Sequence, residues 1–531
     1  MCTAEVYERD PRHLLHEVVS KWARERPGDP ALVGHGREGA ISWREFEAGS
    51  AAVSASLAGM GFRRGDFLAA SLPFVPETVL LEYACFRIGV IFAPLDLRLA
   101  PAEVARGIQT LGARGYVFPS RLRELGAAMR THCEHTVELE QGFPPPRPQD
   151  VEAARRLSAE VAENDAALVI FTTGSTGAPK AALLSHRNIT CQNMCLGGAF
   201  AFREGMRVLV NLPASHVGGQ TELLMTTLFF GGTAVLLDIF DAARSLEAIA
   251  RHRVNLIGQI PAMFQLEWRL SSYGGSDLSS LESAIYGGQQ VPAPFLEKLA
   301  AMAPHIGTGL GLTEAAGFCT YTRRGATPED IASSIGFDMP VYPMSIREPM
   351  DAGGRAGREL PGGEIGNICF RGPQTFLGYV HDPEATARTI SRDGWLYTGD
   401  LGYRDAQGLH LCGRSKWVIK PRGYQVFPSD VENHLCALPD VANAGVVGVE
   451  HAVHSEAIVA FVEPKPGATL DVAELKRHAR GMASYMRPLH YVVLQPGGLP
   501  LNRVAKVDYL RLSEMASAEV NHLRAQRRWD R

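Results

Sequence analysis

The feature that most constrains the fold is a repeated alternation between short apolar runs and helical periods, which begins near residue 60. Residues 66–73 (DFLAASLP) predict a strand, residues 77–89 (ETVLLEYACFRIG) a helix and residues 90–96 (VIFAPLD) the next strand. The same alternation returns in residues 207–253 and again in residues 283–302. Strands that alternate with helices at this spacing form parallel sheets whose faces are covered by helices.

The chain is long enough for more than one such unit. Its 531 residues suggest about two to four domains. The proline-rich residues 143–148 (FPPPRP) predict a surface connection between two helix-covered units. Past residue 360 the pattern changes to short strands and turns, which predicts a small barrel-like β subdomain. We therefore predict an α/β fold with a large N-terminal domain over residues 1–414 and a small α+β C-terminal domain over residues 415–531.

Composition narrows the class of protein. The formal net charge of −4 leaves no basic footprint, which predicts no nucleic-acid partner. The N-terminus has no apolar signal segment, and the longest apolar run, residues 223–237, is too short to cross a bilayer, so we expect a soluble, cytoplasmic protein without a membrane partner. The nine cysteines show no CxxC spacing, which argues against a disulfide framework or a zinc site. The polar tail after Leu512 is interpreted as a solvated helix end.

The first segment that carries chemistry is residues 171–180, FTTGSTGAPK, which follows an apolar run typical of a strand. Glycines let backbone N–H groups approach an anion closely, hydroxyl groups add donors, and Lys180 supplies positive charge. These residue types together predict a cradle for a triphosphate. The spacing of Gly174, Gly177 and Lys180 differs from that of a Walker A loop, and Ala181 follows where that loop has Ser or Thr. Taken alone, such a segment is more often a turn without a ligand.

Six further segments extend the pattern down the chain. In their order and spacing, they and residues 171–180 resemble the adenylate-forming superfamily, which includes acyl-CoA synthetases, firefly luciferase and peptide-synthetase adenylation domains. The resemblance covers residues 30–512. One match of this kind is weak, but an ordered set with compatible spacing is specific. The six segments are Leu212–His216 (LPASH), Tyr286–Gln289 (YGGQ), Gly309–Glu314 (GLGLTE), Tyr397–Asp400 (YTGD), Gly413–Val426 (GRSKWVIKPRGYQV) and Pro500–Lys506 (PLNRVAK).

The resemblance implies an ATP-dependent acid–thiol ligase with two half-reactions. A carboxylic acid is joined to the α-phosphate of ATP with release of pyrophosphate, and the acyl group of this acyl-adenylate then passes to coenzyme A. A carboxylate is a poor electrophile, so it must be activated by joining it to the α-phosphate. This step gives a protein base little to do, so catalysis is mainly positioning and charge neutralisation. ATP, Mg²⁺ and coenzyme A are the implied cofactors.

Three other functions remain open at this point. A stand-alone adenylation enzyme would deliver its acyl group to a carrier-protein thiol or to a second enzyme. Luciferase-type oxygenation also occurs within the superfamily, although no residue here favours it. A nucleotide-binding protein without activity is disfavoured, because the charged groups that the chemistry requires are all present in the sequence.

The resemblance also assigns roles around the nucleotide. It implies that Lys506 bridges the substrate carboxylate and the α-phosphate, that Glu314 coordinates Mg²⁺ and that Thr313 contacts the α-phosphate. Asp400 suits the ribose, because a carboxylate accepts hydrogen bonds from two vicinal hydroxyl groups, and Arg414 adds a donor there. The implied ATP-binding residues are Thr172, Thr173, Gly174, Ser175, Thr176, Lys180, Gly288, Gln289, Leu310, Gly311, Thr313, Asp400, Arg414 and Lys506.

The acyl pocket is placed in the same way. His216 ends a segment that forms a pocket wall and joins the catalytic set, although a lone histidine of this kind is otherwise a hydrogen-bonded core residue. Amino-acid activators of the family carry an aspartate near this histidine, and residues 214–220 contain none. The other wall residues are small, which predicts volume for a bulky, ring-bearing acid. The implied pocket residues are His216, Val217, Gly218, Gly219, Gly287, Gly288, Gly309 and Leu310.

The resemblance further implies a mobile C-terminal domain. This domain swings about Lys416, withdraws Lys506 and presents a loop to the thiol of coenzyme A. The residues implied at the hinge and the thioester face are Lys416, Lys420, Gly423 and Tyr424.

Three positions depart from the family pattern. Ala181 and Ala505 replace glycine, and Leu310 replaces an aromatic residue that stacks on adenine. Ala181 costs about 1 kcal/mol only if its φ is positive. None of the three changes removes a charged group that the chemistry requires, but together they leave open a slow half-reaction or release of the acyl-adenylate to a partner.

Overall fold

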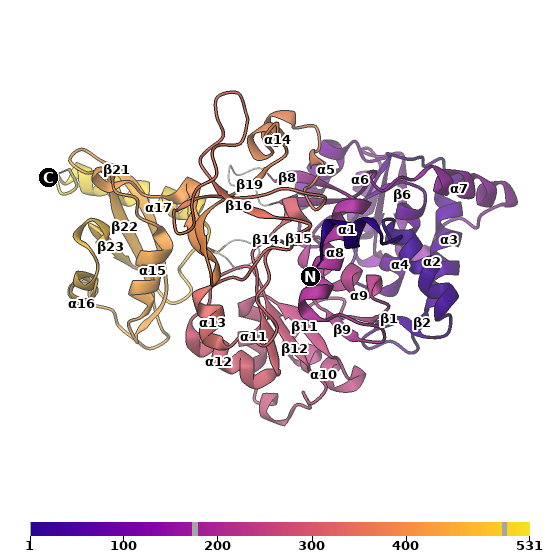
Figure 1. The fold of residues 1–531 in the computed structure, drawn as a ribbon, viewed down its shortest axis with the longest axis horizontal. Helices are drawn as coiled ribbons and strands as arrows, with labels where there is room; N and C mark the ends of the chain where they lie inside the picture. Colours follow the sequence, from indigo (N-terminus) through magenta and orange to yellow (C-terminus); the bar gives the residue numbers. More distant parts are fainter. Residues whose placement is uncertain (1, 173–178, 502–506, 531) are drawn as a thin grey trace.

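The computed structural model describes residues 2–172, 179–501 and 507–530. Over these residues the chain forms two seven-stranded sheets, a four-stranded sheet, a two-stranded ribbon and a C-terminal three-stranded sheet. Figure 1 shows the two large sheets with their helices in indigo to pink, and the C-terminal sheet with its helices in orange and yellow at one end of the molecule. The α/β fold predicted from the sequence is confirmed.

The first large sheet has the order β13-β12-β11-β9-β10-β1-β2. All neighbours pair in parallel except β2, which runs antiparallel to β1 at the edge. Buried residues of helices α10, α11 and α12, such as Ile249, Phe264 and Leu299, cover one face. The elements are β13 (His305–Gly307), β12 (Ser283–Tyr286), β11 (Leu256–Gln259), β9 (Arg207–Val210), β10 (Thr233–Leu236), β1 (Pro30–Gly34), β2 (Ile41–Ser42), α10 (Ala242–His252), α11 (Pro261–Trp268), α12 (Ala293–Met302) and α13 (Pro328–Ser333).

The second large sheet has the order β18-β8-β7-β4-β3-β5-β6. Successive side chains along β7 point to opposite faces of this sheet. Leu168 and Ile170 face the large central core, and Val169 faces a smaller hydrophobic cluster under α5. The elements are β18 (Gly378–Tyr379), β8 (Lys180–Ser185), β7 (Ala166–Thr172), β4 (Ile91–Pro94), β3 (Phe67–Ala70), β5 (Gly115–Phe118), β6 (His135–Glu138), α2 (Leu15–Glu25), α3 (Trp43–Gly59), α4 (Pro76–Arg87), α5 (Pro101–Leu111), α6 (Arg123–Met129) and α7 (Pro148–Glu160).

Two details of this sheet differ from the sequence-based expectation. The segment 143–148 is exposed, as predicted, but it connects β6 with α7 and β7 of the same sheet instead of joining two units. Strand β8 is antiparallel to β7, with Thr172 opposite Lys180. A parallel pair needs a crossover of about a dozen residues, and the connection between Thr172 and Lys180 is too short for one.

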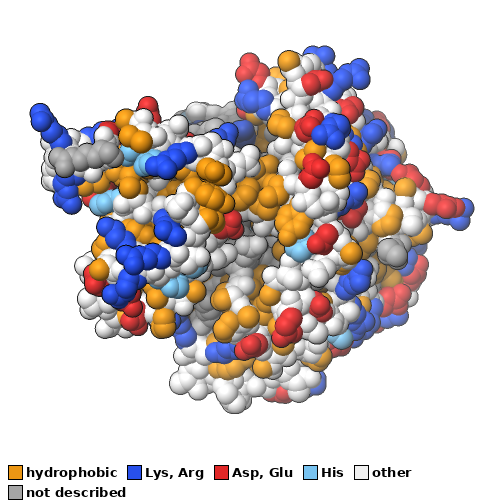
Figure 2. Space-filling view, turned by 60° about the vertical axis from the view of Figure 1, so that its left-hand side comes forward, with side chains coloured by type: hydrophobic (Ala, Val, Ile, Leu, Met, Phe, Trp, Pro, Cys, Tyr) orange, Lys and Arg blue, Asp and Glu red, His pale blue; other side chains and the backbone are white. Residues whose placement is uncertain are grey.

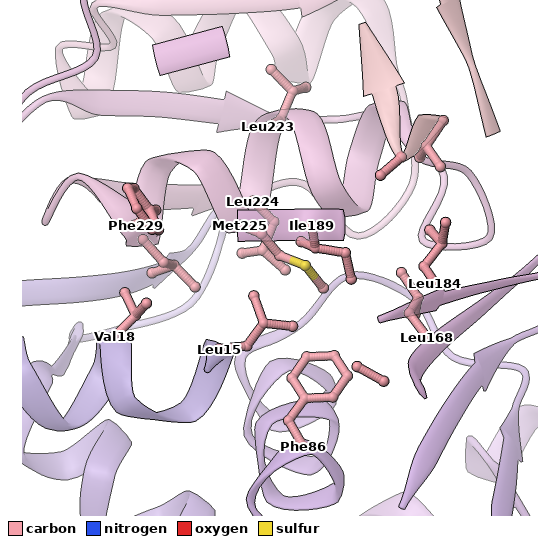
Figure 3. Packing of buried hydrophobic residues seen from close by; sticks show 14 of the residues in the cluster. Leu15, Val18, Phe86, Leu168, Leu184, Ile189, Leu223, Leu224, Met225 and Phe229 are labelled. Atoms are coloured by element: carbon pink, nitrogen blue, oxygen red, sulfur yellow. The ribbon is translucent and has the colours of Figure 1, made fainter. Parts of the chain in front are cut away.

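The central core joins the two large sheets. Figure 3 shows Leu168 of β7 and Leu184 of β8 near Ile189 of α8 (His186–Phe200), with residues of α2, α4 and α9 (Thr226–Phe229) around them. A π-helix, η3 (Gly218–Met225), contributes Leu224 and Met225 to this core. Short π-helical segments occur frequently at functional sites because they change which side chains face a ligand. Glu222 of η3 is not part of this core.

The predicted β subdomain is an antiparallel sheet with the order β16-β17-β19-β20. The short ribbon β14-β15 includes residues of the GLGLTE segment, and β15 contacts η3 and α8. The elements are β16 (Met344–Arg347), β17 (Gly366–Phe370), β19 (Leu396–Asp405), β20 (Gly408–Arg414), β14 (Gly311–Leu312), β15 (Gly317–Phe318) and α14 (Pro383–Thr389).

The C-terminal sheet has the order β21-β22-β23 and its own hydrophobic clusters. The tail is not a solvated helix end: Leu512, Val520 and Leu523 of α17 are buried against β21 and β22, and so is Trp529. None of the helices formed by the described residues is both long and apolar enough to span a bilayer. The elements are β21 (Val441–His451), β22 (Ser455–Pro464), β23 (His490–Val493), α15 (Pro428–Cys436), α16 (Val472–His478) and α17 (Tyr509–Ala525).

Candidate active site

The carboxyl edge of the first sheet gathers three of the predicted segments. Strand β9 leads into the loop that carries His216, β12 leads into Gly288 and Gln289, and β13 leads into Leu310. These strands are parallel, so their carboxyl ends lie on the same edge. Ligands of open α/β sheets bind at this edge. Gly288 and Gln289 are exposed there, whereas Leu310 is buried in the central core.

The predicted phosphate loop starts and ends on paired strands. Thr172 closes β7 and donates a hydrogen bond from Oγ1 to the backbone oxygen of Lys180, which opens β8, at 3.4 Å. The hairpin thus fixes both ends of the segment. The predicted ligands Thr173, Gly174, Ser175 and Thr176 lie outside the described residues.

A tyrosine connects this loop with the predicted Mg²⁺ ligand. The ammonium of Lys180 lies 5.0 Å from the ring centre of Tyr379, and the Tyr379 hydroxyl donates to Oε1 of Glu314 at 2.6 Å. Burial, reinforced by the carboxylate of Glu314, raises the pKa of Tyr379 well above its usual value, so the hydroxyl stays a donor. Tyr379 could not be predicted from motifs, because nothing in the sequence distinguishes it among the 14 tyrosines.

The position of Glu314 is compatible with Mg²⁺ bound together with phosphates. Its backbone oxygen accepts from the N–H of Phe376 at 2.9 Å, which joins the GLGLTE segment to the chain just before β18. Proteins commonly hold Mg²⁺ through one or two carboxylates, with substrate phosphates and water as the other ligands. Across residues 2–172, 179–501 and 507–530, no three His, Cys, Asp or Glu side chains cluster as a ready metal site. Thr313 lies next to Glu314 and is partly exposed.

The predicted ribose ligands form an ion pair in the β subdomain. Asp400 and Arg414 are register partners on β19 and β20, and Nε of Arg414 lies 2.8 Å from Oδ1 of Asp400. The Asp400 side chain is 7% exposed and that of Arg414 is 54% exposed. The N–H of Asp400 donates to Oγ1 of Thr398 at 3.1 Å. The carboxylate is thus held by the strand pair, and the guanidinium remains largely open to solvent.

His216 is not the buried core histidine that the sequence left open. It is exposed, and its Nδ1 accepts from the N–H of Gly218 at 3.2 Å. Gly218 opens the π-helix η3, and Val217 before it is buried. The imidazole therefore lies at the start of this helix with its position defined by a backbone donor.

The glycines of the predicted acyl pocket pack closely against other groups. A Cβ atom added to Gly287 or Gly309 would lie 3.1 Å or 3.2 Å from the ring of Phe318, and one added to Gly219 would lie 2.6 Å from a backbone oxygen. At these three positions the small residue therefore leaves no free volume for the acid, contrary to the prediction. Gly288 has a φ of +99°, which explains its identity through the backbone.

The residues predicted for the hinge and the thioester face lie on exposed turns. Lys416 belongs to the short helix η6 (Ser415–Trp417) and lies 4.6 Å from the ring centre of Trp417. Lys420 and Gly423 are exposed, and Gly423 has a φ of +85°. Tyr424 is 55% exposed and stacks on Tyr485, with ring centres 4.4 Å apart. The predicted catalytic Lys506 and its neighbour Ala505 lie outside the described residues.

The departure at Ala181 is harmless. Ala181 pairs with Phe171 in the β7–β8 hairpin and is absent from the described non-glycine residues with positive φ. The methyl group therefore adds no backbone strain.

Family models match both parts of the chain. The AMP-binding enzyme model matches residues 19–380, and the model of the AMP-binding enzyme C-terminal domain matches residues 430–506. Feruloyl-CoA synthase from Amycolatopsis sp is 31% identical over 453 residues, which cover 85% of this chain and 89% of the relative. 4-Coumarate–CoA ligase 5 from Oryza sativa subsp. japonica is 28% identical and covers 91% of each chain.

Solved structures give the same result. The ATP-bound crystal structure of MatB from Rhodopseudomonas palustris matches with a TM-score of 0.78 at 26% identity, over 95% of this chain and 99% of that one. The chain belongs to the AMP-binding enzyme family. Within that family it is an adenylate-forming acid–CoA ligase.

Proposed function

We propose that this ligase activates a bulky, ring-bearing aryl acid with ATP and Mg²⁺ and transfers the acyl group to coenzyme A. Two relatives are named for acids that contain an aromatic ring, feruloyl-CoA synthase and 4-coumarate–CoA ligase.

The observation that carries the proposal is the contact chain from Lys180 through Tyr379 to Glu314. It places a cation and a carboxylate at the base of the Gly- and Thr-rich loop. In the proposed complex, Lys180 would neutralise phosphate charge and Glu314 would hold Mg²⁺ against the same phosphates. Asp400 would accept from the ribose hydroxyl groups, with Arg414 beside it.

We further propose that the chain divides after Arg414 and that residues 415–531 act as a lid. The hydrophobic clusters support this division, because the two C-terminal clusters contain no described residue before Ile419. Lys416 would serve as the pivot, and the exposed Lys420, Gly423 and Tyr424 would face the thiol. Lys506 would bridge the acid and the α-phosphate.

Hydroxylamine trapping of the activated acid tests the first half-reaction. Purified protein is incubated with ATP, Mg²⁺ and aryl, fatty, terpenoid or amino acids, and hydroxamate formation is measured. The proposal predicts the highest rates with aryl acids. Higher rates with fatty or amino acids would refute the substrate class, and no acid-dependent hydroxamate would refute the activity.

Product analysis tests the acceptor. The best acid is incubated with coenzyme A or with a phosphopantetheinylated carrier protein, and the thioesters are identified by mass spectrometry. Formation of acyl-CoA supports the proposal. Acyl transfer to the carrier protein alone would favour the stand-alone adenylation enzyme.

A further inference from the structure

One carboxylate of the π-helix η3 lies on the acyl side of the site. A Cβ atom added to Gly218 would lie 3.4 Å from Oε2 of Glu222, and one added to Gly311 would lie 3.5 Å from Oε1. The Cβ position of Gly218 is also 3.4 Å from Nδ1 of His216. Glu222 thus lies between the His216 segment and the GLGLTE segment, the two walls assigned to the acid.

The backbone on the opposite side is shaped to admit this carboxylate. Gly317 has a φ of +128°, and a Cβ atom added there would lie 2.7 Å from Oε1 of Glu222. Oγ1 of Thr221 donates to the backbone oxygen of Ala316 at 2.6 Å, which ties η3 to the same stretch of chain. Any larger residue at position 317 would displace Glu222.

A buried amide faces the same point. Gln192 of α8 is 0% exposed, and its Nε2 lies 3.1 Å from the Cβ position of Gly317. Its Oε1 accepts from Nδ2 of Asn193 at 2.9 Å, but Nε2 has no acceptor among the described residues. A buried donor without a partner costs about 1–3 kcal/mol, so such groups are normally satisfied by a ligand or by water.

The electrostatics of Glu222 support a role in binding. Burial raises the pKa of Glu222 to about 7, and a hydrogen bond from the backbone of Phe318 opposes that shift. The side chain nevertheless keeps partial solvent access, unlike the fully buried Gln192. A titratable group that is held partly desolvated beside a pocket is typical of a functional position.

The two side chains offer complementary halves of one hydrogen-bond pattern. Glu222 is an acceptor, and Nε2 of Gln192 is a donor that lacks an acceptor. A hydroxyl group can donate to the first and accept from the second at once. An ammonium group can satisfy only the carboxylate, because it has no lone pair for the amide.

We propose that Glu222 and Gln192 bind a ring hydroxyl of the acid substrate, which donates to the Glu222 carboxylate and accepts from the Gln192 amide. This inference rests on the proposed aryl-acid ligase activity and narrows its substrate to hydroxylated aryl acids. Gly317 is a positioning residue that leaves room for the pair.

The test compares acids that differ by one group. Wild-type enzyme is assayed for acyl-CoA formation with cinnamate, 3-hydroxycinnamate, 4-hydroxycinnamate and 4-aminocinnamate. The inference predicts that kcat/KM for one hydroxycinnamate exceeds that for cinnamate by about 10- to 100-fold, the usual range for a hydrogen bond to a charged group. Equal values for cinnamate and both hydroxycinnamates, or a preference for 4-aminocinnamate over both hydroxycinnamates, would overturn it.

Variants then assign the preference to these residues. Glu222→Ala and Gln192→Met should each reduce kcat/KM for the preferred hydroxycinnamate by about 10-fold or more while cinnamate turnover changes by less than about 3-fold. Equal losses with both acids would show a structural role and overturn the inference. Glu82→Gln is the control, because Glu82 of α4 is a buried carboxylate that lies in a different helix, away from Glu222.

The screen keeps the two proposals separate. If the preferred acid proves to be an aryl acid without a ring hydroxyl, the inference fails and the proposed function stands. If no acid gives ATP-dependent hydroxamate, the proposed function fails and the inference fails with it. Circular dichroism and the melting temperature confirm that each variant is folded before its kinetics are interpreted.

Discussion

The phosphate side and the acyl side of the site are built differently. On the phosphate side, Lys180 opens a strand of a hairpin, and Asp400 and Arg414 are register partners in an antiparallel pair. On the acyl side, Glu222 lies on a π-helix whose neighbours are glycines. Hydrogen bonds between strands fix the first set, whereas the second is fixed by local hydrogen bonds to Ala316 and Phe318 and by close packing against glycines.

This difference suits the two ligands. The triphosphate is common to all adenylate-forming reactions, so its ligands can be held by backbone registers that tolerate little change. The acid differs between enzymes, and a short helix lined by glycines allows its side chains to be exchanged without altering a sheet. The face in Figure 2 is hollowed near its middle, with hydrophobic side chains around the hollow and basic side chains on the left. This face of the molecule thus carries both apolar and basic side chains.

The largest expected effect concerns Lys506. Lys506→Ala should lower acid-dependent pyrophosphate release by about 100- to 1000-fold, because loss of one donor to a developing charge has effects of that order. ATP binding, measured by calorimetry, should change little. An unchanged rate of pyrophosphate release would remove the role assigned to this lysine, and Lys465→Ala on the same domain serves as the control.

Tyr379 tests whether the phosphate side acts as a connected unit. Tyr379→Phe deletes the hydroxyl that holds Oε1 of Glu314 at 2.6 Å and keeps the ring beside Lys180. We expect a rise of about 10-fold in the Mg²⁺ concentration needed for half-maximal activity, since a single hydrogen bond to a charged group is worth about 1.5–3 kcal/mol. The relative rates with different acids should stay the same. A changed acid preference would contradict the separation of the two sides.

Gly317 tests the acyl side. Gly317→Ala introduces a methyl group at a φ of +128° and 2.7 Å from Glu222. We expect the free energy of unfolding to fall by about 1–3 kcal/mol, in the range for strained backbone positions. Gly275→Ala, where a Cβ atom would meet nothing within 4 Å, is the matched control for urea denaturation. Equal stability of both variants would show that the space beside Glu222 is not restricted.

The last expected effect is a pH dependence of stability. Burial raises the pKa of Glu222 from 4.5 to about 7, so the native state keeps a proton that the unfolded state releases. Between these values the free energy of unfolding of the wild type should decrease as the pH rises, relative to Glu222→Gln, by up to about 1–3 kcal/mol. His216, Cys319 and Tyr321 face or interact with Glu222 in both proteins, so the difference isolates its titration. Parallel stability curves from pH 5 to pH 8 would contradict a desolvated carboxylate.

The sequence predicted much of the fold because the evidence of periodicity is local. The strand at residues 67–70, the helix at residues 76–87 and the strand at residues 91–94 all follow from their apolar spacing. The antiparallel pairing of β8 with β7 was not predicted, because strand direction within a sheet depends on which strands meet in space. The buried face of α17 was also missed, although Leu512, Ala516, Val520 and Leu523 have the spacing of one face of an amphipathic helix.

The site was predictable where its residues belong to contiguous motifs. Asp400 and Arg414 were predictable because each lies in a recognisable motif, and the antiparallel register of β19 and β20 brings them together as an ion pair. Tyr379 and Glu222 carry no motif, and their roles arise from contacts with Glu314 and Gly317, far away in the sequence. Glu222 lies two residues beyond positions 214–220, where the family pattern places an acidic residue, and so was not predicted.

Isotope exchange between pyrophosphate and ATP is the decisive measurement for the proposed adenylation, because it reports the reversible first half-reaction without coenzyme A. We expect exchange that requires both Mg²⁺ and an aryl acid in the wild type, and exchange reduced by about 100-fold or more in Glu314→Ala. Exchange that proceeds without any acid, or that survives in Glu314→Ala at the wild-type rate, would contradict it.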